Sequence, residues 1–288
     1  MRCSRRSGRD NWARAMDAKS YLVTELIDAG LNRREARWLV EEFSPSDHET
    51  IDALRAAARR RLDGEPIQYV LGHWPFRSLD LDLDPRVLIP RPETEELVGL
   101  AFDELMQRRL KDPLIVDLGC GSGAIGLSLL FELRQMGVDA TLVAVDSSLD
   151  ALEVTRANAA KHALEDVTTV HSSWFEGLDE SLLGRVDLIV ANPPYVGATE
   201  FATLDPVLGY EPFAALVAED TPIAQGFLDL EVIIGQSCPW LVANGLLICE
   251  HGNMHRPAVL QAARDAMFSD VQDLDDMFGN PRFLIAKL

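Results

Sequence analysis

The sequence predicts an α/β protein in which a mostly parallel sheet is wound by helices on both faces, with a small helical domain in front of it. From residue 114 onward, short apolar runs alternate with segments of helical period, and the connections between them are short. This alternation is typical of a doubly wound sheet. Before residue 63 the apolar residues recur only at helical spacing. A glycine-rich loop directly follows the first strand of the alternating part.

The composition narrows the classes of partner. The 288 residues suit two domains, and 47% hydrophobic with 25% charged residues is ordinary for a soluble globular protein. A formal net charge of -19 disfavours non-specific binding to nucleic acid, which needs Lys and Arg to neutralise phosphates. The same charge suits a basic protein partner. The net charge therefore leads us to expect no direct binding to nucleic acid. No apolar run is long enough to span a bilayer, so we expect no membrane partner either.

The cysteines are not spaced for a zinc site or a disulfide framework, so we expect no metal and a cytoplasmic location. They are Cys3, Cys120, Cys238 and Cys249. Residues 1–15 are predicted to be a disordered basic tail, because the basic start lacks the apolar core of a secretory signal. A mitochondrial presequence and a true start at Met16 are the alternatives.

Residues 16–74 are predicted to form the helical domain. Apolar residues recur at helical spacing from Tyr21 to Glu42, and Gly30 divides this segment into two helices. A third helix is predicted from Ser46 to Leu62, where Gly64-Glu65-Pro66 stops it.

Residues 75–90 are predicted to form a β-hairpin that links the two domains. Leu and Asp alternate along residues 79–84, Asp84-Pro85-Arg86 turns the chain, and Val87-Leu88-Ile89 returns. The domain at 91–288 then begins with an amphipathic helix from Glu93 to Leu110, favoured by Pro92 and by the acidic residues of its first turn.

The remaining elements alternate between strand and helix. Strands are predicted at Leu114–Leu118, Thr141–Val145, Val167–His171, Asp187–Ala191 and Gly245–Glu250, with a closing pair near Val271–Leu274 and Phe283–Ala286. Helices are predicted at Ala124–Met136, Ala151–Ala163 and Gln225–Leu241.

The glycine-rich loop, Asp117-Leu118-Gly119-Cys120-Gly121-Ser122-Gly123, lets the backbone approach a ligand closely. The next strand ends at Asp146, which is placed to bind ribose hydroxyls or to cap the following helix. A dinucleotide site is the alternative, but the order Asp-x-Gly-x-Gly-x-Gly looks more like class I S-adenosylmethionine-dependent methyltransferases. Asp117 suits the cationic methionine end of that cofactor, and it would repel a pyrophosphate. Trp174, after the third strand, either faces the adenine or fills a gap in the core.

The segment Asn192-Pro193-Pro194-Tyr195 follows the buried strand that ends at Ala191. Neither proline has an N–H to donate, so the strand stops here. An Asn side chain and a Pro carbonyl offer acceptors to both hydrogens of a planar –NH2 group, and a Tyr ring can stack on that group. We interpret the segment as a clamp for an amide or an exocyclic amine, although an ordinary exit from a strand is the plainer explanation.

With these residues in hand, the chain resembles the HemK/PrmC family of protein-(glutamine-N5) methyltransferases, which act on peptide chain release factors. The resemblance covers the chain from about Tyr21 onward. It is carried by Arg61–Gly72, by Val87–Glu95 with its Ile-Pro-Arg-Pro-Glu-Thr core, and by the glycine loop together with Asn192–Tyr195. Two stretches depart from the family pattern, Ala218–Pro222 in the loop 218–226 and Asn253-Met254-His255.

The resemblance implies a class I methyltransferase fold (Rossmann-like, with a seven-stranded sheet), S-adenosyl-L-methionine as cofactor and S-adenosyl-L-homocysteine as product. It implies a substrate-recognition role for the helical domain, the Gly-Gly-Gln glutamine of class I release factors as substrate, and a monomer. Implied catalytic residues are Asn192 and Tyr195. Implied cofactor-binding residues are Asp117, Leu118, Gly119, Cys120, Gly121, Asp146, Trp174 and Asn192, and implied substrate-binding residues are Asn192, Pro193, Pro194 and Tyr195.

An adenine amino methyltransferase acting on DNA or RNA is the alternative, because the same clamp fits an exocyclic adenine amine. That reaction requires base flipping and a basic channel. The acidic net charge argues against it.

Overall fold

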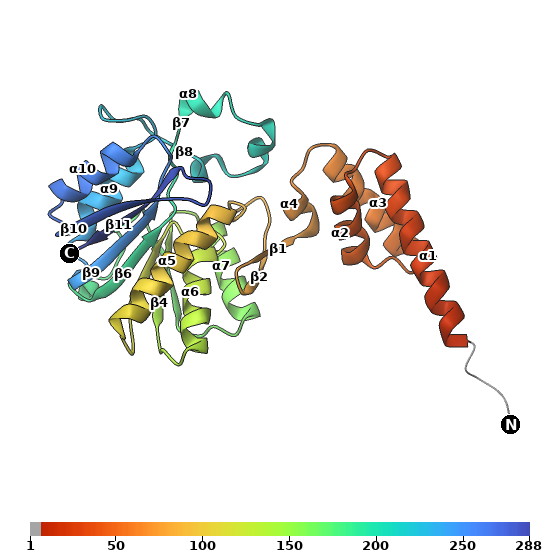
Figure 1. The fold of residues 1–288 in the computed structure, drawn as a ribbon, viewed down its shortest axis with the longest axis horizontal. Coiled ribbons are helices and arrows are strands. Elements are labelled where there is room, and N and C mark those ends of the chain that lie inside the picture. Colours follow the sequence, from red (N-terminus) through yellow and green to blue (C-terminus); the bar gives the residue numbers. More distant parts are fainter. Residues whose placement is uncertain (1–6) are drawn as a thin grey trace. The chain divides into compact units, whose positions relative to one another are not determined.

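The computed structural model describes residues 7–288, with side chains described from Ala18 onward. It has the predicted α/β architecture (Figure 1). A seven-stranded sheet runs in the order β10-β11-β9-β6-β3-β4-β5, and only the pairings of β11 with β9 and β10 are antiparallel. The predicted mostly parallel seven-stranded sheet is therefore confirmed. Its strands are β3 (Leu114–Leu118), β4 (Thr141–Asp146), β5 (Val167–His171), β6 (Val186–Ala191), β9 (Leu241–Glu250), β10 (Asp270–Asp275) and β11 (Pro281–Lys287).

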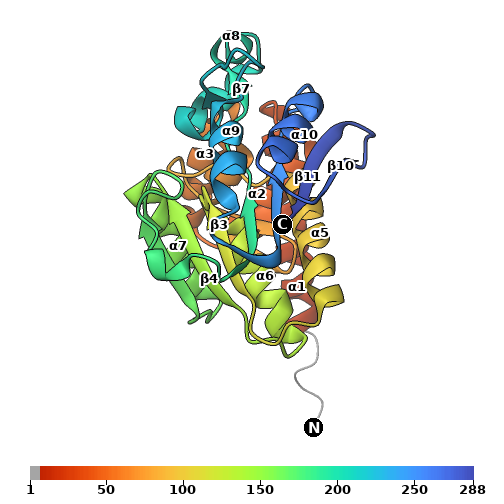
Figure 2. The same cartoon turned by 90° about the vertical axis from the view of Figure 1, so that its left-hand side faces the viewer.

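Helices cover both faces of this sheet (Figure 2). The helices α5, α6 and α7 pack on one face, and α9 and α10 pack on the other. This follows from right-handed crossovers, because the chain moves one way from β3 to β5 and the opposite way from β6 to β9. The helices are α5 (Pro92–Arg108), α6 (Ala124–Gln135), α7 (Leu149–Lys161), α9 (Leu228–Ser237) and α10 (Arg256–Asp265).

An insertion at 196–218 leaves the sheet after β6 and returns before α9. Its ends pair as a short parallel ribbon of β7 (Val196–Gly197) and β8 (Val217–Ala218). The helix α9 is shorter than the predicted Gln225–Leu241, because Gly226 takes a left-handed backbone before it and Pro239 lies beyond its end. The insertion holds α8 (Ala198–Phe201), η2 (Pro206–Tyr210) and η3 (Phe213–Ala215), and η1 (Glu180–Leu182) precedes β6.

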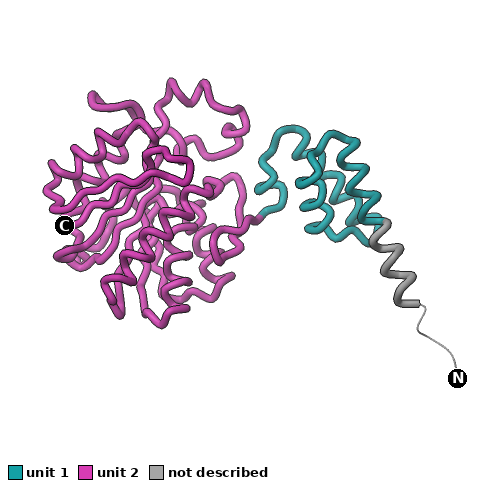
Figure 3. Tube along the Cα trace, viewed as in Figure 1, with its two compact units in different colours: residues 1–72 teal, residues 73–288 magenta. Residues whose placement is uncertain are grey.

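The chain divides into two compact units, residues 1–72 and 73–288 (Figure 3). The first contains only helices in its described part, and their amphipathic faces pack together through buried residues such as Leu26, Leu39 and Leu54. Asp47 and Thr50 form a capping box at the start of α3. The first six residues of the predicted tail, and the side chains of its other residues, lie outside the described residues. The helices are α1 (Ser7–Asp28), α2 (Arg33–Phe43), α3 (His48–Leu62) and α4 (Ile67–Leu71).

The hairpin differs from the prediction. It consists of β1 (His73–Phe76) and β2 (Leu79–Asp82), with its turn at Arg77-Ser78 and not at Asp84-Pro85-Arg86. It belongs to the second unit and is not a free linker, because the buried Asn158 on α7 bonds both the N–H and the carbonyl of Asp82. The segment 87–89 is not a strand, since a side chain and not a neighbouring strand takes the N–H of Ile89.

Candidate functional site

The site lies at the carboxyl ends of β3, β4, β5 and β6, where the order of the sheet reverses. The strand β4 lies on one side of β3, and β6 lies on the other. In open α/β sheets, ligands bind outside the strand ends at such a point. A cleft of about 490 Å³ opens there, and we call it the larger cleft. The predicted cofactor residues that line it are Gly119, Gly121, Asp146, Trp174 and Asn192. Those that do not line it are Asp117, Leu118 and Cys120.

Asp146 fixes the glycine loop at the floor of the larger cleft. Its Oδ2 accepts a hydrogen bond from the Gly121 N–H at 2.9 Å, and its Oδ1 accepts one from the Ser148 N–H at 2.9 Å. The cap of α7 is Ser148, whose Oγ accepts from the Ala151 N–H. Burial raises the pKa of Asp146. Each carboxylate oxygen has a second lone pair, so Asp146 can hold the loop and still accept a ribose hydroxyl.

Asp117 is completely buried at the end of β3. Its Oδ2 accepts from the Gly126 N–H at 2.9 Å, and its Oδ1 has no hydrogen-bond partner within the described residues. Burial raises the pKa of Asp117 to about 7. A buried carboxylate oxygen without a donor is costly. A ligand with a cationic amino group would supply both the donor and the charge, so the residue fits the methionine end of the predicted cofactor.

Leu118 and Cys120 support the loop from behind. Leu118 belongs to the core, and the Cys120 Sγ lies 3.4 Å from the Thr155 Oγ1. Burial raises the pKa of the Cys120 thiol. A protonated buried thiol is a poor nucleophile, so both side chains act in packing.

Trp174 connects the glycine loop to α9. Its Nε1 donates to the Asp229 Oδ1 at 3.1 Å, and a Cβ at Gly119 would lie only 3.3 Å from its Cζ3. The ring packs partly on the core and also lines the larger cleft. The ring therefore fills space in the core, and because it also lines the cleft, its adenine-facing role stays a prediction.

A smaller pocket of about 230 Å³ adjoins the larger cleft. Tyr195 lines only this smaller pocket. The residues that line both are Leu88, Asn192, Pro193, Pro194 and Ala215. The Asn-Pro-Pro segment is thus the wall common to the two spaces, and a group held at Asn192 is within reach of both.

The Asn192 amide is oriented by α5. Its Nδ2 donates to the Thr94 Oγ1 at 3.1 Å, and no donor within the described residues reaches its Oδ1. The Thr94 hydroxyl in turn donates to the Glu250 Oε2 at 2.7 Å. An amide that commits its nitrogen to Thr94 offers its oxygen as an acceptor on the opposite edge.

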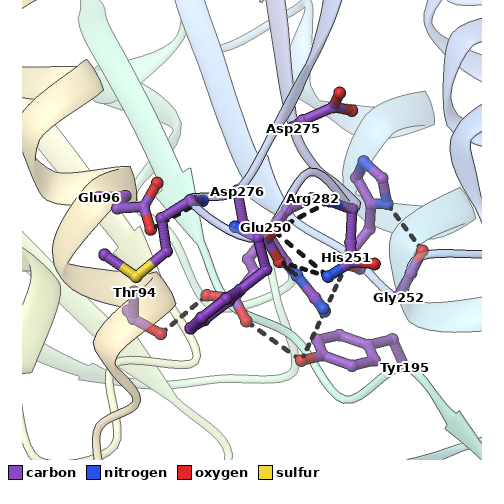
Figure 4. Close-up of polar contacts among 12 residues, drawn as sticks. Thr94, Glu96, Tyr195, Glu250, His251, Gly252, Asp275, Asp276 and Arg282 are labelled. Atoms are coloured by element: carbon purple, nitrogen blue, oxygen red, sulfur yellow. Dashed lines mark hydrogen bonds and ion pairs between the residues drawn. The ribbon is translucent and has the colours of Figure 1, made fainter.

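Tyr195 shares the same buried carboxylate (Figure 4). Its hydroxyl donates to the Glu250 Oε1 at 3.1 Å, and Arg282 reaches the hydroxyl from the other side at 3.5 Å. Burial and the adjacent Glu250 raise the pKa of Tyr195, so the phenol stays protonated. Burial also raises the pKa of Glu250, and Arg282 opposes that shift. Tyr195 is therefore a rigid wall of the pocket and not a base.

An ion pair closes the smaller pocket from the side of the insertion. Arg91, which lines the pocket, donates to the Glu211 Oε1 at 2.6 Å. The other oxygen of Glu211 accepts from the Ile89 N–H at 2.9 Å. The Glu211 side chain is only 2% exposed, so this carboxylate depends on both partners.

Sequence reasoning missed the residues that hold the clamp. The sequence marked these residues only by where they stand in the chain. Thr94 lies inside a motif of the resemblance, and Glu250 ends a buried strand. Spacing could not pair them, since the chain separates them by 156 residues. The missed residues are Arg91, Thr94, Glu211, Glu250 and Arg282.

The loop 218–226, which contains the departing stretch Ala218–Pro222, contacts His255 of the other departing stretch. The His255 Nε2–H donates to the Gln225 carbonyl at 2.7 Å. Burial lowers the pKa of His255, and the hydrogen bond to the Gln225 carbonyl opposes that shift.

Comparisons with known proteins show what the whole chain is similar to. The model of the methyltransferase small domain (MTS) matches residues 101–205. A release factor glutamine methyltransferase of Salmonella typhimurium is 35% identical over 93% of this chain and 97% of its own length. The MTRF1L release factor glutamine methyltransferase of Homo sapiens is 34% identical over 94% of this chain and 80% of its own. Among solved structures, the hMettl16 catalytic domain in complex with the MAT2A 3′UTR hairpin 1 shares the fold, with a TM-score of 0.57 and 14% identity over 84% of this chain and 80% of that chain.

Within residues 7–288, every helix is too short or too polar to span a bilayer. Among the side chains described from Ala18 onward, no group of three His, Cys, Asp or Glu is arranged to hold a metal ion.

Proposed function

This chain belongs to the release factor glutamine methyltransferase family, and on that premise we propose that it methylates a release factor at its Gly-Gly-Gln glutamine. The methyl group would come from S-adenosyl-L-methionine, and the acceptor would be the side-chain amide nitrogen of that glutamine. The observation that carries the proposal is the common wall. Asn192, Pro193 and Pro194 line both the larger cleft and the smaller pocket. A donor in one space and an acceptor in the other would meet at Asn192.

The larger cleft suits the cofactor. When bound, S-adenosyl-L-methionine supplies an electrophilic methyl group on a sulfonium. Asp146 would accept ribose hydroxyls, and Trp174 would flank the adenine. Asp117 lies behind the glycine loop and does not line the cleft, and its unpaired Oδ1 would receive the amino group only where the bound ligand reaches past the loop. The fixed glycine loop keeps these groups in place before binding, so little ordering is required when the ligand arrives.

The smaller pocket suits an amide on an extended chain. Its lining is mostly apolar and narrow, so the glycines beside the substrate glutamine would let the loop enter. The Asn192 Oδ1 and the Pro193 carbonyl would accept the two amide hydrogens and turn the nitrogen toward the donor. Tyr195 would limit movement of the amide plane. We assign the rate enhancement mainly to positioning, which is worth about 7–11 kcal/mol when geometry is good.

The proton balance needs no strong base at the site. Methyl transfer gives the nitrogen a positive charge, and the N–H acidity rises so far that water can accept the proton. Tyr195 is not the acceptor, because burial and Glu250 raise its pKa and a protonated phenol is a very weak base. The adenine alternative is not favoured, since the relatives are named for release factors and the net charge is -19.

The test offers the full chain, S-adenosyl-L-methionine and one of three acceptors: a class I release factor, the same factor with Gln→Asn in Gly-Gly-Gln, or single-stranded nucleic acid. We expect a single methyl on the peptide that contains the glutamine, located by mass spectrometry. The shorter Asn falls one methylene short of the donor and should stay unmodified. Methyl transfer to the nucleic acid alone would overturn the proposal.

A further inference from the structure

Glu250 contacts Tyr195 of the clamp directly and Asn192 only through Thr94. It lines neither the larger cleft nor the smaller pocket. Its side chain is 1% exposed and lies at the end of β9. One carboxylate oxygen accepts a hydrogen bond from the Thr94 hydroxyl, and the other accepts one from the Tyr195 hydroxyl (Figure 4). Burying a carboxylate between two hydroxyls costs desolvation free energy. This cost suggests that Glu250 has a function beyond packing.

The direction of each hydrogen bond in this network follows from that carboxylate. A carboxylate only accepts, so the single hydrogen of the Thr94 hydroxyl is used at 2.7 Å from the Glu250 Oε2. The Thr94 oxygen is then only an acceptor toward Asn192. The Asn192 Nδ2 must face it, as it does at 3.1 Å. The opposite orientation would bring two acceptors together without a hydrogen between them.

We propose that Glu250 is a positioning residue that acts through Thr94 to keep the Asn192 Oδ1 turned toward the substrate amide. The proposal rests on the proposed function for the identity of that amide, but the orientation of Asn192 is independent of it. A neutral side chain at position 250 would no longer fix the direction in which the Thr94 hydroxyl donates its hydrogen. The Thr94 hydrogen could then rotate toward Asn192, and both orientations of the Asn192 amide would be populated.

Two substitutions of Thr94 separate this role from packing. Thr94→Val keeps the shape of the side chain and removes the hydroxyl, whereas Thr94→Ser keeps the hydroxyl and removes the methyl group. If Thr94 acts by polarity, the kcat of Thr94→Ser should exceed that of Thr94→Val by about tenfold or more. If Thr94 only fills space at its 3% exposed site, the order should be reversed.

The experiment compares wild type, Thr94→Ser, Thr94→Val and Glu250→Gln in release factor methylation, with thermal melting to identify folded variants. We expect the kcat of Glu250→Gln to fall about 10- to 100-fold, while the KM for S-adenosyl-L-methionine stays near the wild-type value. A wild-type kcat in Glu250→Gln, or a higher kcat in Thr94→Val than in Thr94→Ser, would overturn the proposal.

A second readout does not need turnover. The side-chain NH2 signals of Asn192 are assigned in a ¹⁵N spectrum by their loss in Asn192→Asp. They should shift in Thr94→Val and in Glu250→Gln, and shift less in Thr94→Ser. Unshifted signals in Thr94→Val would refute the coupling. If wild type left the release factor unmethylated, the proposed function would fail, and these signals would still decide the role of Glu250.

Discussion

The larger cleft and the smaller pocket are held by contacts of different range. In the larger cleft, backbone groups near the strand ends form the supporting hydrogen bonds. Asp146 accepts from the N–H of Ser148, two residues away, and from that of Gly121, 25 residues away. In the smaller pocket, Asn192 bonds Thr94 across 98 residues. Arg91 pairs with Glu211 across 120 residues.

This difference separates two kinds of effect. The loop of the larger cleft is formed by its own strand ends, so a change there should alter cofactor affinity and leave the rest of the site intact. The smaller pocket exists only where distant side chains meet. A change there should alter turnover or folding, even where the substituted residue is several contacts away from a ligand.

The largest effect is expected at the common wall. Asn192→Ala removes the acceptor that orients the nucleophile, so kcat should fall about 100-fold or more, as misplaced reacting groups cause. The Kd for S-adenosyl-L-methionine, measured by calorimetry, should change much less. Asn253→Ala, at an exposed Asn, is the matched control. Turnover near the wild-type rate in Asn192→Ala would show that the two spaces are not coupled through this side chain.

The next effect concerns the long-range ion pair of the smaller pocket. Arg91→Ala leaves the buried Glu211 carboxylate with only the Ile89 N–H, so the free energy of unfolding should fall by about 2 kcal/mol. The exposed pair of Arg134 with Asp166 is the control, and Arg134→Ala should cost less than about 1 kcal/mol. Thermal melting of both variants checks the difference. Equal losses would mean that burial does not distinguish the pairs.

In the larger cleft, Asp146→Ala should weaken S-adenosyl-L-methionine binding about tenfold or more, because each hydrogen bond to a charged group contributes about 1.5–3 kcal/mol. Asp146→Asn keeps one acceptor and should lose less. Calorimetry measures both variants, and thermal melting identifies the variants that stay folded without the bonds from Gly121 and Ser148. An unchanged Kd in Asp146→Ala would remove this residue from the cofactor site.

The smallest effect is a pH dependence at Asp117. Its pKa is about 7 without ligand, so the carboxyl is mostly neutral at pH 6 and must release a proton to hold a cationic group. Cofactor affinity should therefore rise by up to about tenfold between pH 6 and pH 8. In the ligand-free protein the sign is opposite, and the stability contributed by Asp117 falls as pH rises from 3.8 to about 7.

Asp117→Asn isolates this dependence, because it removes the titrating group and keeps the shape. The pH slope of the Kd should flatten in that variant, and any slope that remains belongs to other groups, including the amine of the cofactor. A slope identical to that of wild type would exclude Asp117 as the group that receives the cation.

Much of the fold was predictable, because it follows from local pattern. The strands Leu114–Leu118 and Val167–His171 have the bounds that the sequence predicted. The hairpin was predicted with the wrong turn, since the Leu and Asp alternation continues past Asp82 while pairing ends there. Pairing ends because Asn158, 76 residues away, takes the backbone groups of Asp82. No periodicity of the hairpin itself records that contact.

The sequence by itself determined the order of elements, the glycine loop with Asp146, and the Asn-Pro-Pro-Tyr wall, because each depends on residues adjacent in the chain and on hydrophobic period. Only the tertiary structure decided that the Asn192 Nδ2 donates to Thr94, that Tyr195 donates to Glu250, and that Arg91 pairs with Glu211. A hydrogen bond requires about 3 Å between donor and acceptor. That distance is set by how β6, β9, α5 and the insertion pack together, and spacing along the chain carries no record of it.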